Sequence, residues 1–128
     1  MTARVVDASV VVATIRDGAR PMLDPGTRMM VPHLLDVEVA SALRRLVRGA
    51  AVAPDDARSA LVRLATLPGI VRHPHTSLIG RAWELRDNFS AYDAVYVALA
   101  ERLKIPLVTL DGRLARAAAD YCDVELVE

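Results

Sequence analysis

Residues 90–111 read SAYDAVYVALAERLKIPLVTLD, and this stretch decides the fold. The part from Ser90 to Lys104 predicts a helix, and its segment Ala94–Ala100 is apolar nearly all round, which indicates that the helix is buried. The part that follows, Ile105–Leu110, is the clearest strand of the chain. A buried helix that leads into a short apolar strand is typical of α/β proteins with a parallel sheet.

Strands and helices alternate along the rest of the chain. Short β-branched or apolar runs predict further strands at Arg4–Val6, Arg28–Val31, Gly69–Arg72 and Asp123–Val127. Apolar spacing and capping signals predict helices from Ser9 to about Asp17, from His33 to Arg48, from Pro54 to about Leu67, from a Thr76 cap to just before Asn88, and from Gly112 to Asp120. Gly18, Pro21, Pro25 and Gly26 mark a loop. This order predicts one α/β domain over residues 1–128, with about five mainly parallel strands and helices on both faces.

The composition limits the classes of function. A hydrophobic share of 53% in 128 residues suffices for one core and argues against disorder. Charges interrupt every apolar run well before the roughly 20 residues of a membrane span, and Asp7 without a following cleavage site argues against a signal peptide. The only cysteine, Cys122, can form no intrachain disulfide, so a reducing cytoplasm is expected. Because 16 basic and 16 acidic residues cancel, the placement of the charges matters more than their sum.

Two acidic residues directly follow predicted strands. Asp7 comes after the first strand and Asp111 after the fourth. Ligands of such sheets bind outside the carboxyl ends of the strands, where the strand order reverses, so both acids are expected at a site. Either could instead only cap the helix that follows it, and for Asp111 an Asx turn with capping is the favoured alternative.

Asp93 and Glu38 are two further candidates. The segment Ser90–Asp93 has the form of a capping box, but the buried helix behind it would place Asp93 at the rim of the sheet, so capping and function are compatible. Glu38 lies about a turn and a half into its predicted helix and has no cation three or four residues away. A carboxylate among apolar neighbours needs a tertiary partner, water or a ligand.

If these four acids converge, they form a site made of carboxylate oxygens alone. Such a site repels itself unless a hard cation neutralises it, and oxygen ligands select Mg²⁺ or Mn²⁺ over zinc. Such ions can activate water and stabilise the leaving oxygen in phosphodiester cleavage. Ser9 and Thr109, which flank the same rim, are candidates for orienting a water or a phosphate.

Four segments resemble the PIN-domain family, in the expected order and over the whole chain. They are VVDAS at 5–9, Pro32 followed by EVASALRR at 38–45, SAYDAVYVALA at 90–100 and PLVTLDGRL at 106–114. The resemblance implies a three-layer α/β/α fold and an endoribonuclease that depends on Mg²⁺ or Mn²⁺. It implies that Asp7, Glu38 and Asp93 hold the metal, with Asp111 as a more variable fourth acid.

The short length further resembles the toxin half of VapBC toxin–antitoxin pairs. This implies an RNA substrate, a homodimer and a cognate VapB-like antitoxin that inhibits the toxin. The residues that we expect to contact RNA phosphates are Arg44, Arg45, Arg48, Arg113 and Arg116, although cations at a helix end also complement the helix dipole.

Other readings explain less of the sequence. A response-regulator-like phosphoacceptor domain would need a lysine after the last strand, whereas the sole lysine, Lys104, precedes a strand. A Rossmann nucleotide-binding domain would need a glycine-rich phosphate loop, which the chain lacks. A catalytically silent PIN-like module that binds RNA or protein remains the main alternative, and four mutually repelling carboxylates argue against it.

Overall fold

The computed structural model describes residues 2–16 and 22–128 and contains a five-stranded parallel sheet. The strand order is β3-β2-β1-β4-β5, with β1 at Ala3–Val6, β2 at Arg28–Pro32, β3 at Ile70–His73, β4 at Leu107–Thr109 and β5 at Val124–Leu126. Every neighbouring pair runs parallel. The strand predictions are confirmed. The predictions for Asp17, Gly18 and Pro21 fall outside the described residues.

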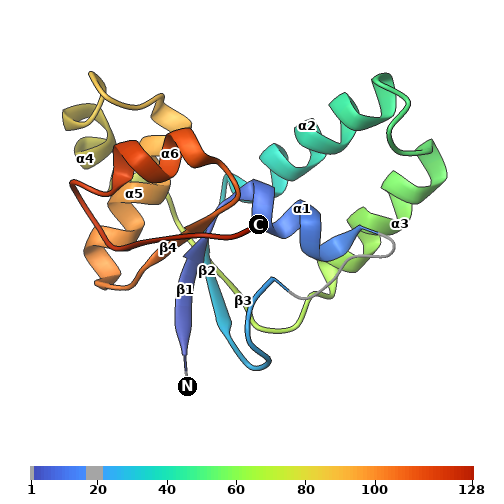
Figure 1. Cartoon of the computed structure of the whole chain (residues 1–128), viewed down its shortest axis with the longest axis horizontal. Coiled ribbons are helices and arrows are strands. Elements are labelled where there is room, and N and C mark those ends of the chain that lie inside the picture. Colours follow the sequence, from blue (N-terminus) through green and yellow to red (C-terminus); the bar gives the residue numbers. More distant parts are fainter. Residues whose placement is uncertain (1, 17–21) are drawn as a thin grey trace.

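Helices cover both faces of the sheet, so the expected three-layer α/β/α architecture is confirmed (Figure 1). The helices are α1 (Ala8–Ile15), α2 (Leu35–Arg48), α3 (Pro54–Ala65), α4 (Ile79–Glu84), α5 (Ala91–Leu103) and α6 (Gly112–Ala118). The chain builds the sheet outward from β1 to β3 and then returns to β4 beside β1. Because parallel crossovers are right-handed, this return places α4, α5 and α6 on the face opposite α1, α2 and α3.

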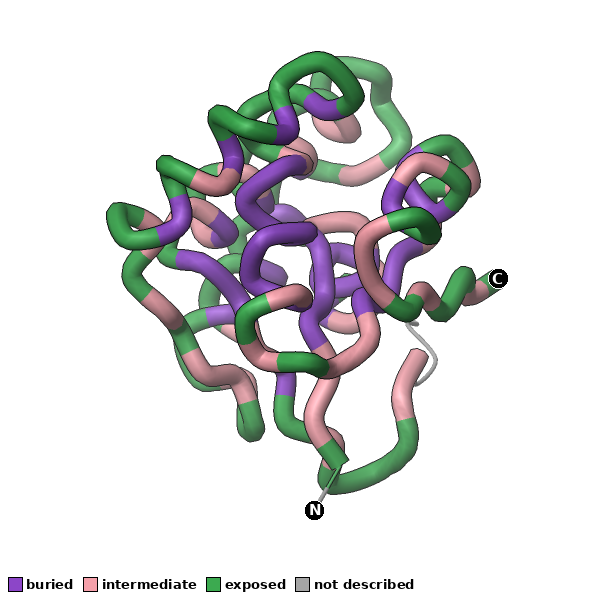
Figure 2. The backbone as a smooth tube through the Cα atoms, turned by 90° about the vertical axis from the view of Figure 1, so that its left-hand side faces the viewer, coloured by how far each residue is buried: buried purple, intermediate pink, exposed green. Residues whose placement is uncertain are grey.

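The core lies around α5 and the central strands, where Figure 2 shows the buried residues gathered. Every residue of α5 from Ala94 to Ala100 is buried, as its apolar composition predicted. Val5 and Val6 of β1 and Leu107 and Val108 of β4 are fully buried because these strands are covered on both faces. The reversal point of the sheet, between β1 and β4, is therefore held by a rigid core.

The fourth strand is shorter than the predicted Ile105–Leu110 because the N–H of Ile105 is hydrogen-bonded within the end of α5. Lys104 ends the helix in the left-handed conformation, at φ 55°, and the Ile105 N–H donates back to the Ala100 carbonyl at 3.3 Å. Pro106 has no N–H to contribute. Regular pairing consequently begins at Leu107.

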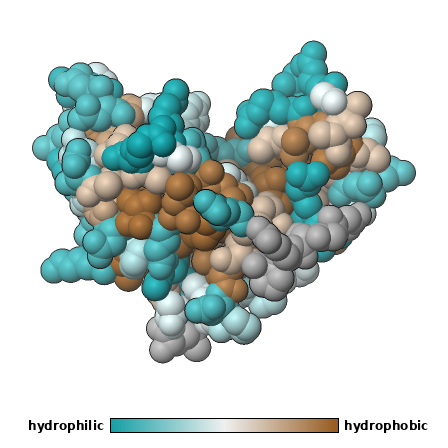
Figure 3. All heavy atoms as spheres, viewed as in Figure 1, coloured by the Kyte–Doolittle hydropathy of each residue, from teal (hydrophilic) through white to brown (hydrophobic). Residues whose placement is uncertain are grey.

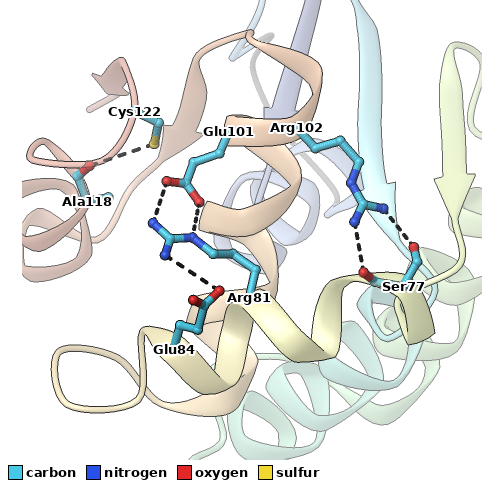
Figure 4. A network of polar contacts seen from close by, with 7 residues as sticks. All are labelled: Ser77, Arg81, Glu84, Glu101, Arg102, Ala118 and Cys122. Atoms are coloured by element: carbon cyan, nitrogen blue, oxygen red, sulfur yellow. Dashed lines mark hydrogen bonds and ion pairs between the residues drawn. The ribbon is translucent and has the colours of Figure 1, made fainter.

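The prediction that Thr76 caps a helix is wrong. Thr76 lies within a 3₁₀ turn, Thr76–Leu78, which precedes α4, and no side chain caps that turn. Instead, α4 is anchored to α5 by side chains (Figure 4): the Arg81 guanidinium donates twice to Glu101, at 2.9 Å each, and Arg102 donates to Ser77. Within the described parts of the chain, no helix is long and apolar enough to span a membrane.

We expect Lys104→Gly to stabilise the protein. A left-handed residue with a side chain costs about 1 kcal/mol that glycine avoids, so the free energy of unfolding should rise by about 0.5–1 kcal/mol. Urea denaturation followed by circular dichroism measures the change. Ala40→Gly, at an exposed position inside α2, should lower the free energy of unfolding by about 1 kcal/mol. A destabilising Lys104→Gly would contradict the assignment of the helix end.

Candidate functional site

Asp7 is the acid that the structure holds most firmly. It follows β1, caps α1 and is only 7% exposed. Its carboxylate accepts hydrogen bonds from the Ser9 hydroxyl at 2.5 Å, the Thr109 hydroxyl at 2.5 Å and the Val10 N–H at 3.2 Å. Burial raises the pKa of Asp7, and these three hydrogen bonds only partly oppose that rise. Both alternatives for Asp7, cap and site residue, are therefore compatible with its position.

Ser9 and Thr109 link Asp7 to the end of β4. The Ser9 hydroxyl oxygen accepts the Leu110 N–H at 3.1 Å, and the Thr109 hydroxyl oxygen accepts the Asp111 N–H at 3.0 Å. Both hydroxyl protons point to Asp7. These two side chains thus hold the Asp7 carboxylate, and their role in orienting a water or a phosphate stays a prediction.

Glu38 has the tertiary partner that its apolar surroundings required. It is the fourth residue of α2, which begins at Leu35 and not at the predicted His33, so it lies one turn into the helix. His33 belongs to a turn, and its N–H pairs with the His73 carbonyl at 2.8 Å. Glu38 Oε1 accepts a hydrogen bond from the hydroxyl of Tyr96 at 2.7 Å. Burial raises the pKa of Glu38, and the hydrogen bond from Tyr96 lowers it in part.

Tyr96 is a site residue that the sequence reasoning missed. It is 1% exposed in the middle of α5, and burial together with the charge of Glu38 raises the pKa of its phenol far above the ordinary value. The phenol therefore stays protonated and acts as a donor. One signal was available, since a hydroxyl in an otherwise apolar buried helix must find a partner.

Asp93 and Asp111 stand at the starts of α5 and α6. Ser90 caps α5 by accepting the Asp93 N–H at 3.1 Å, as predicted. The return half of the capping box is missing, and the Asp93 carboxylate accepts no hydrogen bond from any residue that the structure describes. Asp111 caps α6 by accepting the N–H groups of Arg113 at 2.9 Å and Leu114 at 3.3 Å. Capping is thus confirmed for Asp111, while Asp93 keeps a free carboxylate.

Electrostatic interactions show that the four acids share one region. The charge of Asp93 raises the pKa of Glu38, the charge of Asp111 raises that of Asp93, and Asp7 contributes to both shifts. Asp111 in turn raises the pKa of Asp7. The four residues come from β1–α1, α2, α5 and β4–α6. The four acids are therefore near enough to interact electrostatically, and their convergence into one site stays a prediction.

The chemistry of the donor set fits a hard divalent cation. The donors are carboxylate oxygens that repel one another, with burial raising the pKa of Asp7, Glu38 and Asp93. As the side chains are placed, no three His, Cys, Asp or Glu residues within 2–16 and 22–128 are grouped tightly enough to hold a metal ion. The Asp93 carboxylate accepts no hydrogen bond from the described residues, so its oxygens are available to a ligand.

Only some of the predicted arginines lie beside the acids. Arg45 lowers the pKa of Glu38 and Arg113 lowers that of Asp93, so each stands close to one carboxylate. Arg44 and Arg48 instead line an apolar groove between α2 and α3, and Arg116 lies over Gly112. Figure 3 shows the surface hollowed between α2–α3 and the part of the molecule that carries α4, α5 and α6.

Comparisons with known proteins agree on one family. A family model described as the PIN domain matches residues 4–120. A VapC ribonuclease from Mycobacterium bovis is 44% identical over 124 residues, which cover 96% of this chain and 97% of that protein. Ribonuclease VapC1 from Mycobacterium tuberculosis is also 44% identical, over 96% of both chains.

Solved structures share the fold at low identity. VapBC2 from Rickettsia felis, bound to a DNA fragment from its promoter, has a TM-score of 0.68 at 12% identity and covers 99% of this chain and 100% of that chain. VapC20 from Mycobacterium tuberculosis, described as a toxin that cleaves the sarcin-ricin loop, has a TM-score of 0.65 at 18% identity with the same coverage.

The raised carboxyl pKa values predict how stability depends on pH. An acid whose pKa is higher in the folded state than in the unfolded state stabilises the fold at low pH, and this contribution is lost as the pH rises through the folded value. In EDTA, the free energy of unfolding should therefore fall as the pH rises above the ordinary carboxyl range. Asp36 has the opposite effect on stability, because its hydrogen bond with Arg72 lowers its pKa, and its contribution is lost as the pH falls.

Urea denaturation at a series of pH values measures the free energy of unfolding. Its fall with rising pH should be smaller in Asp7→Asn. A stability that rises over this range would contradict the raised pKa values of these acids.

We expect Tyr96→Phe to raise the pKa of Glu38 further, because the hydrogen bond that favours the charged carboxylate is lost. An NMR titration of the Glu38 carboxyl carbon measures the shift. Tyr121→Phe, which removes a hydroxyl bonded to Asn88, should leave that titration unchanged. An equal titration of Glu38 in both variants would contradict the Tyr96 contact.

Proposed function

Because this chain belongs to the PIN-domain family and is a VapC-type toxin ribonuclease, we propose that Asp7, Glu38, Asp93 and Asp111 are the residues with which it cleaves RNA. One observation supports this assignment above the others. Carboxylates that are far apart in sequence converge at the reversal point of the sheet, where burial and mutual repulsion raise the pKa values of Asp7, Glu38 and Asp93. Such an arrangement costs stability and is explained by a ligand that carries positive charge.

Mg²⁺ or Mn²⁺ is the ligand that we propose for these oxygens. When bound, such an ion supplies the positive charge that activates water and stabilises the leaving oxygen in phosphodiester cleavage. Asp7, Glu38 and Asp93 would hold it, with Asp111 as the fourth acid. VapC ribonucleases are in general metal-dependent, and the oxygen-only donor set agrees with a hard cation.

Neighbouring residues fix the orientation of two of these acids through hydrogen bonds. Ser9, Thr109 and the Val10 N–H fix the Asp7 carboxylate, and Tyr96 fixes one oxygen of Glu38. Both acids are thereby held in orientation by hydrogen bonds from neutral groups. Arg45 and Arg113 stand at the edge, where guanidinium groups can contact the phosphates of RNA.

An antitoxin is the partner that the VapC family implies, since these toxins act in toxin–antitoxin pairs. We further propose that the toxin is cytoplasmic and forms a homodimer. The silent binding module explains the site less well, because a domain without chemistry gains nothing from a buried Asp7 that destabilises the fold.

We expect Asp7→Asn and Asp93→Asn each to slow RNA cleavage by about 100-fold or more, because each removes charge from the proposed cation site. Cleavage of a labelled RNA pool in Mg²⁺, in Mn²⁺ and in EDTA measures the effect, and EDTA should abolish it. Asp36→Asn is the matched control, because Asp36 lies on α2 but is paired with Arg72 through two hydrogen bonds of 2.8 Å. Full activity of a folded Asp93→Asn protein would remove Asp93 from the site.

A further inference from the structure

A surface pocket of about 370 Å³ adjoins the acidic site. It is lined by Val37, Glu38, Ser41 and Arg45 of α2 and by Tyr92 at the start of α5. Glu38 belongs to both the pocket and the acidic site, and Tyr92 directly precedes Asp93 in the chain. Whatever occupies this pocket therefore lies next to the Glu38 carboxylate.

Two large apolar side chains in this pocket face solvent. Val37 is 73% exposed and Tyr92 is 63% exposed, although α2 and α5 both contribute other residues to the core. Neighbouring exposed apolar groups beside a charged site mark a binding surface. An exposed aromatic ring with a neighbouring aliphatic group suits the flat face of a nucleobase, which stacks on such rings without regard to base identity.

The polar side of the same pocket carries a phosphate-binding group. The Arg45 guanidinium is exposed, and it donates a hydrogen bond to the Ser41 hydroxyl at 3.1 Å, which holds it in place. The Arg45 guanidinium is thus held at a pocket that also contains Glu38, where it can contact a phosphate of a bound strand.

We propose that this pocket binds the nucleotide next to the cleaved phosphate of single-stranded RNA. Its base stacks on Tyr92 against Val37, and its phosphate contacts Arg45. A single strand is favoured over a duplex because bases paired in a helix have no free face to stack on a side chain. This inference rests on the proposed ribonuclease function and adds to it a base-binding subsite in which Tyr92 contacts the base.

Steady-state cleavage kinetics test the proposal, using the oligoribonucleotide that the wild-type protein cuts fastest from a randomised single-stranded pool. Tyr92→Ala should raise KM by about 5- to 150-fold, the range for loss of one stacked base, with a smaller change in kcat. Tyr92→Phe should restore the wild-type KM. Trp83→Ala is the matched control, because Trp83 is a 67% exposed aromatic residue on α4 that lies outside this pocket and outside the acidic site.

The salt dependence tests the phosphate contact separately. Removing one contact to a single strand should reduce the slope of log KM against log salt concentration by about 0.7 in Arg45→Ala. Arg58→Ala, which changes an exposed arginine in the groove between α2 and α3, should keep the wild-type slope.

The outcomes separate this inference from the proposed function. If the wild-type protein cuts RNA and Tyr92→Ala has the KM of Trp83→Ala, the subsite is wrong and the ribonuclease assignment stands. If Tyr92→Ala keeps its KM but no longer binds the antitoxin, the pocket docks protein and the proposal is also overturned. If the wild-type protein cuts nothing, the catalytic assignment fails, and fluorescence anisotropy with the same pool decides the subsite: weaker binding by Tyr92→Ala supports it, and equal binding overturns it.

Discussion

The buried carboxylate of Asp7 is the constraint on which the rest of the site depends. A carboxylate that is only 7% exposed needs hydrogen bonds to compensate for lost water. Asp7 receives them from Ser9 and Val10 at the start of α1 and from Thr109 at the end of β4. The same hydroxyls accept the N–H groups of Leu110 and Asp111. One carboxylate therefore ties β1, α1 and β4 together and sets the place from which the other acids are arranged.

Burying three carboxyl groups at this site lowers the stability of the folded protein when the groups are charged. Burial raises the pKa of Asp7, Glu38 and Asp93, so each of them is less easily ionised in the folded protein than in the unfolded chain. Asp111, which caps α6, is by contrast exposed. The buried phenol of Tyr96 also lowers stability, because it adds a polar group to the core. That group holds Glu38 through a hydrogen bond. A cation bound at these acids would offset their repulsion and would thereby stabilise the folded state.

Much of the fold could be predicted because its signals are local. Apolar residues all round Ala94–Ala100 indicated a buried helix, and β-branched runs between helices indicated a parallel sheet. Errors occurred where the backbone amides of one element are used by another. Ile105 completes the end of α5 instead of starting β4, and His33 extends the pairing towards β3 instead of starting α2. A sequence pattern does not show to which of two neighbouring elements a backbone N–H will donate its hydrogen bond.

By itself the sequence determined the family and the order of the elements, and it predicted four acids as candidates, since Asp7 and Asp111 follow strands and Glu38 has no local partner. Tertiary structure alone decided how these acids are held and what surrounds them. The contact of Glu38 with Tyr96 joins residues 58 positions apart, and that of Asp7 with Thr109 joins residues 102 apart. It also placed Arg45 beside the acids while Arg44 faces a different groove. Helical periodicity assigns a residue to a face, but only the packing of that face decides whether it meets a carboxylate, another helix or solvent.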